Sequence, residues 1–333
     1  MEVKYKFKSL TEEEDRIVKK HFKGSASHNT LVKIVDENND YLVTVNEAFK
    51  DIKHLWRDFK LRDDDVWIIT SPKCGTTWTQ ETTWHIMNGV QLERTQEYLF
   101  QRSPFLDFVT IKGSSLGEAE ELFKKIDELP SPRTIKTHFP LELLPPKLLE
   151  TCKVIFVNRN VRDACVSIYH HFGLMKHFGF DSEFEEFAKE VYVNGLCYNG
   201  GMPAYFAMLK CQYRNIDNPN VLMLWYEDMK KNQREMVKQI KNHIQYDISD
   251  KQIDELTEFM KFENYQKSSS LNKNSMKIQR EGKGNFIRKG IVGDWKNHFE
   301  EQTVQDWDRL IDNQFEKTGI NDKNLLEKVK LQG

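Results

Sequence analysis

Four short apolar runs are spaced along the chain, at residues 66–70, 133–139, 153–158 and 220–226. The third run, Lys-Val-Ile-Phe-Val-Asn, is almost entirely apolar, which is typical of a strand buried on both faces. Segments with helical periodicity follow the runs. This alternation predicts an α/β fold in which helices flank a central parallel sheet. The ligand site of such a sheet is expected at the carboxyl ends of its strands.

The rest of the chain adds helices and one antiparallel hairpin. Two alternating segments, 31–35 and 41–45, flank Asp-Glu-Asn-Asn-Asp and predict the hairpin. Residues 266–285 are rich in Ser, Asn, Lys and Gly, which predicts a mobile loop over the ligand. Without a linker or repeat, we expect one domain, 1–333, with its core at about 40–300. Helices are expected at 11–22, 45–59, 77–87, 118–126, 162–171, 233–243 and 250–262, and again after residue 295.

Composition limits the possible classes of function. The 333 residues are 39% hydrophobic, enough for a sizeable core, and their net charge of −2 gives no general basic field for nucleic acid. The five cysteines form no Cys-x-x-Cys pair, which indicates reduced thiols and no metal site. The first eight residues are charged, and no apolar run approaches the roughly 18 residues of a membrane helix. We therefore expect a cytoplasmic protein that does not bind membranes.

The first candidate site is the stretch Ser-Pro-Lys-Cys-Gly-Thr-Thr-Trp at residues 71–78. It joins an apolar run to a helix, and a helix N-terminus offers unpaired N–H groups and a favourable dipole to an anion. Lys73 adds a positive charge, and Thr76 and Thr77 add hydroxyl donors. The lysine precedes Gly75, unlike the lysine of a G-x-x-x-x-G-K-[ST] nucleotide loop. Taken alone, the stretch also fits an ordinary turn with an exposed lysine.

A second candidate, Lys136-Thr-His138, ends the second apolar run. Side chains alternate along a strand, so Lys136 and His138 should point the same way. The lysine cation favours a neutral imidazole, which suits a general base at pH 7. For this tripeptide alone, a buried histidine in a structural hydrogen bond is the simpler interpretation.

A third candidate follows the next apolar run. Arg159 stands at the strand end, and its planar group suits a phosphate. Ser167 lies in the following helix, near enough to share the same anion. Asp163 is placed to pair with Arg159 or with Arg162. For Arg162 we favour an ordinary surface salt bridge.

The fourth candidate is the basic triplet Arg288-Lys289-Gly290, whose glycine lets the backbone approach a ligand closely. For this triplet alone, a solvated basic loop is the favoured interpretation. Two anion clamps, one at Lys73 and one at Arg159 with Arg288, indicate a nucleotide with phosphates at both ends.

Together these motifs resemble those of the cytosolic sulfotransferases. Residues 71–78 are similar to the family's Y-P-K-S/A-G-T-T-W loop, and residues 136–138 match its K-T-H. Residues 159–170 resemble R-N-x-x-D-x-x-V-S-x-Y-H, residues 226–229 match Y-E-D-M, and residues 288–299 resemble R-K-G-x-x-G-D-W-K-N-x-F. Because the motifs occur in the family's order, we interpret the chain as a member.

The resemblance implies a fold like that of P-loop kinases and transfer of a sulfonate group from 3′-phosphoadenylyl sulfate to a hydroxyl or amine, without a metal. It implies three catalytic residues: His138 as general base, Lys73 at the leaving oxygen, and Lys136 beside the transferred group. The residues implied to bind the nucleotide are Lys73, Cys74, Gly75, Thr76, Thr77, Trp78, Arg159, Ser167, Tyr226, Phe262, Arg288, Lys289 and Gly290. The residues expected to line the acceptor pocket are Phe105, Phe139, Phe172 and Met175.

The chain departs from the family pattern at several positions. Cys74 replaces a small Ser or Ala in the loop. Met-Lys-Phe at residues 260–262 replaces T-S-F, which removes a threonine contact to the nucleotide. His-His-Phe at residues 170–172 stands where vertebrate members have H-F, and it is similar to insect members such as retinol dehydratase.

The family's dimer motif, K-x-x-x-T-V-x-x-x-E, should begin at Lys296. Glu300 and Glu301 stand where its Thr and Val belong. A homodimer is therefore possible, but we do not expect it to use this segment.

The leading hypothesis is a sulfotransferase that acts on the hydroxyl of a small lipophilic alcohol or phenol. The alternative is a dehydratase that sulfonates an allylic alcohol such as retinol and then eliminates sulfate. Retinol dehydratase has a long insertion before its K-T-H, and residues 106–133 are expected to be shorter, which favours simple transfer. Lys73 and His138 argue against a non-catalytic nucleotide-binding protein, and the lysine's position argues against a P-loop kinase. The acceptor itself is not specified by the sequence.

Overall fold

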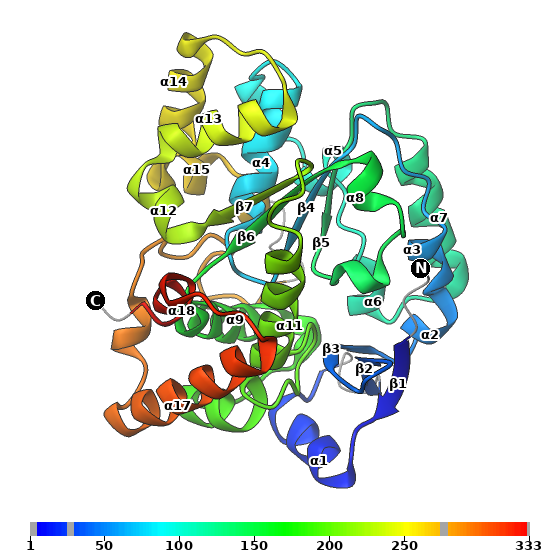
Figure 1. The fold of residues 1–333 in the computed structure, drawn as a ribbon, viewed down its shortest axis with the longest axis vertical. Coiled ribbons are helices and arrows are strands. Elements are labelled where there is room, and N and C mark those ends of the chain that lie inside the picture. The colour runs from blue at the N-terminus through cyan, green and yellow to red at the C-terminus, as the bar shows by residue number, and fades with distance from the viewer. Residues whose placement is uncertain (1–4, 25–29, 274–278, 332–333) are drawn as a thin grey trace.

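The computed structural model describes residues 5–24, 30–273 and 279–331. At its centre lies a four-stranded sheet in the order β5-β4-β6-β7, and every neighbouring pair is parallel (Figure 1). The four predicted strand runs are all present, so the predicted α/β class is confirmed. The strands are β4 (Val66–Thr70), β5 (Thr134–Thr137), β6 (Lys153–Asn158) and β7 (Val221–Trp225).

Alternate side chains of β4 enter two different cores, as a period of two requires. Ile68 packs in a cluster with α4, α13 and α14, whereas Trp67 packs on the opposite face with Trp56 and Phe123. Figure 1 shows α4, α13 and α14 on one side of the sheet, with α7 and the small N-terminal sheet on the other. The bounds of these helices are α4 (Thr76–Met87), α13 (Gln233–Ile244), α14 (Asp250–Phe259) and α7 (Leu116–Asp127).

The small sheet is antiparallel, in the order β1-β2-β3. Its β2-β3 pair is the predicted hairpin. The strand β1 was not predicted, although Tyr-Lys-Phe-Lys-Ser alternates apolar and charged residues. The helix predicted at 45–59 is interrupted and forms two short helices. These elements are β1 (Tyr5–Ser9), β2 (Leu31–Asp36), β3 (Tyr41–Asn46), α2 (Phe49–Ile52) and α3 (His54–Arg57).

A third core lies beyond the carboxyl ends of the strands, around α9 (Val161–Leu174). The Asn160 side chain caps α9 by accepting hydrogen bonds from the N–H groups of Arg162 and Asp163, each at 3.0 Å. This cap fixes the start of α9 directly after β6. The other helices of this core include α11 (Gly201–Arg214), α17 (Glu301–Thr318) and α18 (Lys323–Lys330).

The segment predicted as a mobile loop, 266–285, begins as helix. Its first part belongs to α15 (Phe262–Ser268) and α16 (Ser270–Lys273), because Tyr265 and Leu271 are buried against the core. Residues 274–278 of the predicted loop lie outside the described residues.

The remaining elements connect these layers. Within the described ranges, no helix combines the length and the apolar character needed to cross a membrane. Their bounds are α1 (Glu12–His21), η2 (Leu92–Gln96), α5 (Leu99–Arg102), α6 (Phe108–Lys112), η3 (Leu141–Leu143), α8 (Leu148–Thr151), η4 (Lys176–Phe178), α10 (Phe184–Glu186), the π-helix η5 (Phe187–Tyr192), α12 (Tyr226–Lys231) and η6 (Asp294–Asn297).

Candidate active site

A cavity of about 250 Å³ opens at the carboxyl ends of the sheet. The four candidate groups, far apart in the sequence, meet in its wall. Of the predicted site residues, those that line it are Lys73, Gly75, Thr76, Thr77, Trp78, Phe105, Lys136, His138, Arg159, Ser167, Phe172, Met175, Tyr226, Phe262, Arg288, Lys289 and Gly290.

Two predicted site residues do not line the cavity. Phe139 is fully buried on the opposite face of the sheet, with its ring centroid 5.1 Å from that of Phe49 and 5.5 Å from that of Trp56. It follows His138 directly, so the alternation of side chains turns it away, and its assignment to the acceptor pocket is wrong. Cys74 is buried in the core beside α9, where burial raises the pKa of its thiol to about 12. Its side chain therefore does not reach the cavity.

The loop after β4 requires an unusual backbone. Lys73 has φ of +67° and Gly75 has φ of +104°. A Cβ at Gly75 would lie 2.9 Å from Cδ2 of Tyr226, so the glycine lets that ring pack against the loop. The Lys73 Nζ lies 4.2 Å from the ring centroid of Phe286. Burial, together with Lys136 and other nearby cations, lowers the pKa of Lys73 to about 7.

His138 is held from two sides. Its Nδ1 lies 2.8 Å from the carbonyl oxygen of Thr70, and its backbone N–H donates to Oδ2 of Asp107 at 2.6 Å. Its ring is edge-on to Phe105, with centroids 5.1 Å apart. Burial holds the pKa of His138 well below its ordinary value, and the cation of Lys136 lowers it further.

Asp107 was not predicted as a site residue, yet it supports the K-T-H segment. Its Oδ1 accepts a hydrogen bond of 2.6 Å from the hydroxyl of Thr137, which points away from Lys136 and His138 as alternation predicts. Burial raises the pKa of Asp107 to about 7 and lowers the pKa of Lys136 to about 8. The aspartate lies 30 residues before its partner hydroxyl, and no sequence pattern links the two positions.

Arg159 connects two loops of the site. Its guanidinium donates to the carbonyl oxygens of Lys73 at 3.4 Å and Ile291 at 3.0 Å. It also lies 4.4 Å from the ring centroid of Tyr226. Within the described residues, its buried Nε has no hydrogen-bond partner.

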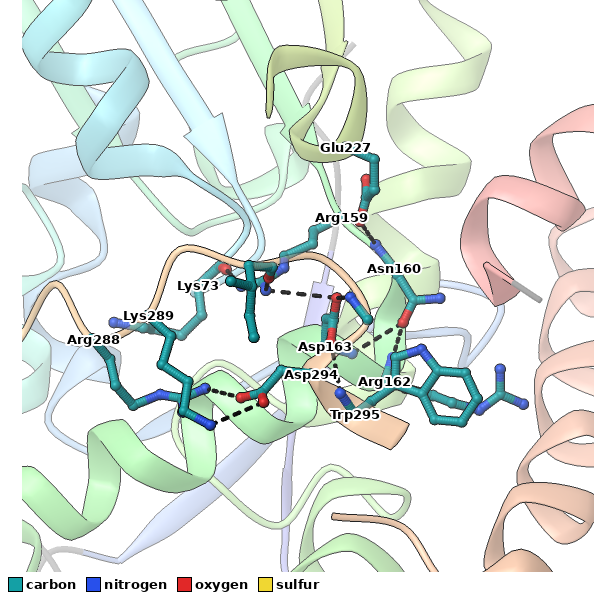
Figure 2. A network of polar contacts seen from close by, with 12 residues as sticks. Lys73, Arg159, Asn160, Arg162, Asp163, Glu227, Arg288, Lys289, Asp294 and Trp295 are labelled. Atoms are coloured by element: carbon teal, nitrogen blue, oxygen red, sulfur yellow. Dashed lines mark hydrogen bonds and ion pairs between the residues drawn. The ribbon is translucent and has the colours of Figure 1, made fainter. Parts of the chain in front are cut away.

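The basic triplet is organised around one carboxylate. Asp294 accepts hydrogen bonds from Arg288 at 2.6 Å and Lys289 at 3.0 Å (Figure 2). Burial would raise the pKa of Asp294, but these hydrogen bonds hold it well below its ordinary range. Gly290 has φ of +63°, and a Cβ there would lie 2.2 Å from the ring of Phe262, so only glycine permits this contact.

The predicted surface salt bridge of Arg162 is wrong. Its side chain is completely buried, where it donates to the carbonyl oxygen of Lys330 at 2.9 Å and pairs with Asp308. Asp163 pairs instead with Arg159, at 3.6 Å. Arg162 therefore anchors the C-terminal helices and does not enter the cavity.

Several cavity residues were missed. Ile168 and His171 share a helical face with Ser167 and Phe172, so helical spacing would have found them. For Phe286 and others on irregular segments, the sequence carries no periodic signal. The missed lining residues are Pro72, Tyr98, Phe100, Phe108, Ile111, Ile168, His171, His177, Phe178, Tyr198, Asn199, Lys230, Met260, Tyr265, Phe286, Ile287 and Ile291. Across the described ranges, no group of three or more His, Cys, Asp or Glu is arranged to hold a metal ion.

Comparison with known proteins assigns this arrangement to a family. The sequence profile described as "Sulfotransferase domain" matches residues 63–319. The chain belongs to the sulfotransferase family. It is 33% identical over 253 residues to sulfotransferase 1E1 of Bos taurus, which covers 74% of this chain and 81% of the relative. Sulfotransferase 1E1 of Homo sapiens is 31% identical over 279 residues, 82% of this chain and 92% of the relative.

Among solved structures, retinol dehydratase in complex with retinol and PAP superposes with a TM-score of 0.84 and 27% identity. The match covers 97% of this sulfotransferase and 100% of the other chain. The expected enzyme class, a sulfotransferase dependent on 3′-phosphoadenylyl sulfate, is confirmed.

Proposed function

We propose that this sulfotransferase transfers a sulfonate group from 3′-phosphoadenylyl sulfate to the hydroxyl of a small lipophilic alcohol or phenol, with His138 as general base. The observation that carries the proposal is the 2.8 Å contact between Nδ1 of His138 and the carbonyl oxygen of Thr70. A carbonyl oxygen only accepts, so Nδ1 carries the proton and Nε2 keeps its lone pair. Since the pKa of His138 is low, this neutral form is present at pH 7.

The residues at one end of the cavity suit the parts of the nucleotide. The start of α4 and Lys73 suit the 5′-phosphosulfate. Trp78 packs edge-to-face with Tyr226, with ring centroids 5.9 Å apart, and these rings together with Phe262 offer an aromatic surface to the adenine. The Nε of Arg159, which has no hydrogen-bond partner among the described residues, supports binding of the 3′-phosphate at the other end. The other residues proposed for the 3′-phosphate are Ser167, Arg288, Lys289 and Gly290.

The acceptor end is apolar and lies beside His138. Phe105, Phe172 and Met175 line it, with further aromatic side chains around them. None of its described lining residues is Asp or Glu, while the basic side chains of Lys73 and Lys136 are present. This balance favours a neutral lipophilic hydroxyl compound over a cationic amine.

The residues have complementary roles in an in-line displacement. Nε2 of His138 takes the hydroxyl proton as the acceptor oxygen forms its bond to sulfur. The bond between sulfur and the bridging oxygen breaks, and Lys73 stabilises the negative charge left on the 5′-phosphate. Lys136 supports charge on the sulfonate during transfer. Positioning and charge stabilisation then provide the catalysis, as in phosphoryl transfer.

The test is the variant His138→Ala. We expect formation of the sulfate ester of a phenol to fall by about 10²–10⁴-fold, the range typical of general-base removal. Calorimetric titration should show unchanged affinity for 3′-phosphoadenosine 5′-phosphate. His243→Ala is a matched control, because Nε2 of His243 also contacts a backbone carbonyl, that of Val154 at 3.2 Å, outside the cavity. Turnover above a tenth of wild type in His138→Ala would refute the assigned role.

A second candidate, elimination of sulfate from an allylic ester, is favoured by the match to retinol dehydratase. Incubating retinol with the protein and 3′-phosphoadenylyl sulfate distinguishes simple transfer from elimination. A stable sulfate ester supports simple transfer, whereas free sulfate with a dehydrated hydrocarbon supports elimination.

We also infer a cytoplasmic location and an alternative dimer surface. All five cysteines are free, which fits a reducing compartment. The N–H of Glu300 donates to Oε1 of Glu185 at 2.8 Å, and the hydroxyl of Thr303 donates to Oε2 at 2.5 Å. Because these contacts occupy the segment after Lys296 within the chain, we propose that any homodimer uses another surface.

A further inference from the structure

We propose that Asp163 positions the basic loop, defined as residues 288–295, and so sets the preference of the site for a nucleotide with a 3′-phosphate. The inference rests on the proposed function, since it concerns the same nucleotide site. Asp163 does not line the cavity. It is therefore a positioning residue that acts through the loop.

The carboxylate of Asp163 holds the loop backbone by two hydrogen bonds (Figure 2). Its Oδ2 accepts from the N–H of Gly293 at 2.7 Å, and its Oδ1 accepts from the N–H of Trp295 at 3.0 Å. Asp163 is only 1% exposed, and its own N–H donates to the capping side chain of Asn160. The first turn of α9 is thus a fixed base for a two-point attachment.

Arg159 holds the same loop as a hydrogen-bond donor, whereas Asp163 is an acceptor. Its Nη2 donates to the carbonyl oxygen of Ile291 and lies 3.6 Å from Oδ2 of Asp163. Ile291 is 45% exposed and Val292 is 39% exposed, so burial of apolar side chains contributes little at the loop tip. The polar attachments to α9 therefore hold the second half of the loop, while Gln266 of α15 holds its start by donating to the carbonyl oxygen of Arg288 at 3.1 Å.

The attachment extends to the cations. The two N–H groups that Asp163 binds flank Asp294 in the chain, so they fix the backbone of that residue. The Asp294 carboxylate in turn binds Arg288 and Lys289, both of which line the cavity. Asp163 therefore sets, through one further carboxylate, where these two cations meet a phosphate.

The variant Asp163→Asn tests this role. The asparagine amide has only one oxygen, which can accept from one of the two N–H groups. Its NH₂ group then faces the other N–H donor. We expect affinity for 3′-phosphoadenosine 5′-phosphate to fall roughly tenfold or more, because charge-assisted hydrogen bonds are lost. Affinity for 5′-AMP, which lacks the 3′-phosphate, should change less than about twofold. Hydrogen exchange of a peptide spanning 286–299 should accelerate.

The same variant should raise the KM for 3′-phosphoadenylyl sulfate while leaving kcat nearly unchanged, because the chemistry occurs at the other end of the nucleotide. The matched control is Asp308→Asn. Asp308 lies on α17 and pairs with Arg162, which is next to Asp163 in the first turn of α9, so this change removes a charge pair at the same turn and leaves the loop contacts intact. It should lower stability but leave the ratio of the two nucleotide affinities unchanged.

An unchanged affinity ratio in Asp163→Asn would overturn the inference. If that variant does not fold, Asp163→Glu provides the measurement, since it keeps the charge and displaces the oxygens by one methylene. A reduced ratio in Asp163→Glu supports positioning, and a wild-type ratio overturns it. If the wild-type protein itself does not prefer the 3′-phosphorylated nucleotide, the proposed function fails, and this inference fails with it.

Discussion

At the scale of single residues, the site is a concentration of positive charge around one neutral histidine. Lys136 is buried and Lys73 is half-buried, and the cations of Lys136, Arg159 and Arg288 all act on Lys73. Burial lowers the pKa of both lysines, and the neighbouring cations lower the pKa of Lys73 further. An anionic ligand relieves the repulsion, so its binding should raise those pKa values and take up protons.

This reasoning predicts that nucleotide affinity falls as pH rises above 7. In the free protein, the pKa of Lys73 is about 7, so the side chain loses its proton between pH 7 and 8. An adjacent anion raises the pKa, so binding at pH 8 requires the proton to be taken up again. We expect the dissociation constant of 3′-phosphoadenosine 5′-phosphate to rise by up to roughly tenfold per pH unit. Isothermal titration at pH 6.5, 7, 7.5 and 8 measures it.

The variant Lys73→Arg isolates the source of this pH dependence. Arginine stays protonated over the whole range, so the slope between pH 7 and 8 should largely disappear. Lys136→Arg is the control and should keep most of the slope, because Lys73 is retained and still loses its proton between pH 7 and 8. A wild-type affinity that is constant between pH 7 and 8 would contradict the prediction.

At the scale of elements, the strands and helices that depend on local periodicity were predicted well from the sequence. The run at Lys153–Asn158 became β6 with its predicted bounds, because a fully buried parallel strand is apolar throughout. Helix α13 also begins where predicted, capped by Asn232. Three of the four candidate groups followed, since they stand at the carboxyl ends of β4, β5 and β6, whereas the basic triplet lies on a segment between α16 and η6.

Features that depend on long-range contacts were not predictable in this way. Asp107 and Asp163 gain their roles from backbone N–H groups that lie 31 and 130 residues further along the chain. Phe139 was misassigned because its neighbour His138 faces the cavity and side chains alternate. Arg162 looks like a surface cation until α17 and α18 cover it. In each case the burial and the role of the side chain depend on residues that it contacts in the fold, and the local sequence pattern does not show these contacts.

At the scale of the whole molecule, one cavity joins segments from most of the chain. Residues that line it come from positions 72 to 291, and include the loop after β4, the end of β5, α9 and the basic loop. Arg159 already links two of these segments in the free protein. A nucleotide bound across the cavity would connect the remainder, so binding and global stability should be tightly linked.

We therefore predict that 3′-phosphoadenosine 5′-phosphate raises the thermal midpoint of unfolding. A ligand that binds only the folded state at one hundred times its dissociation constant adds about 2.7 kcal/mol. For a chain of this size that corresponds to a shift of roughly 5 °C, measurable by differential scanning calorimetry. At the same concentration 5′-AMP should give a clearly smaller shift, because it does not engage Arg159 and the basic loop. His138→Ala should show the wild-type shift, since the general base acts on the acceptor. Equal shifts with both nucleotides would mean that the basic loop does not recognise the 3′-phosphate.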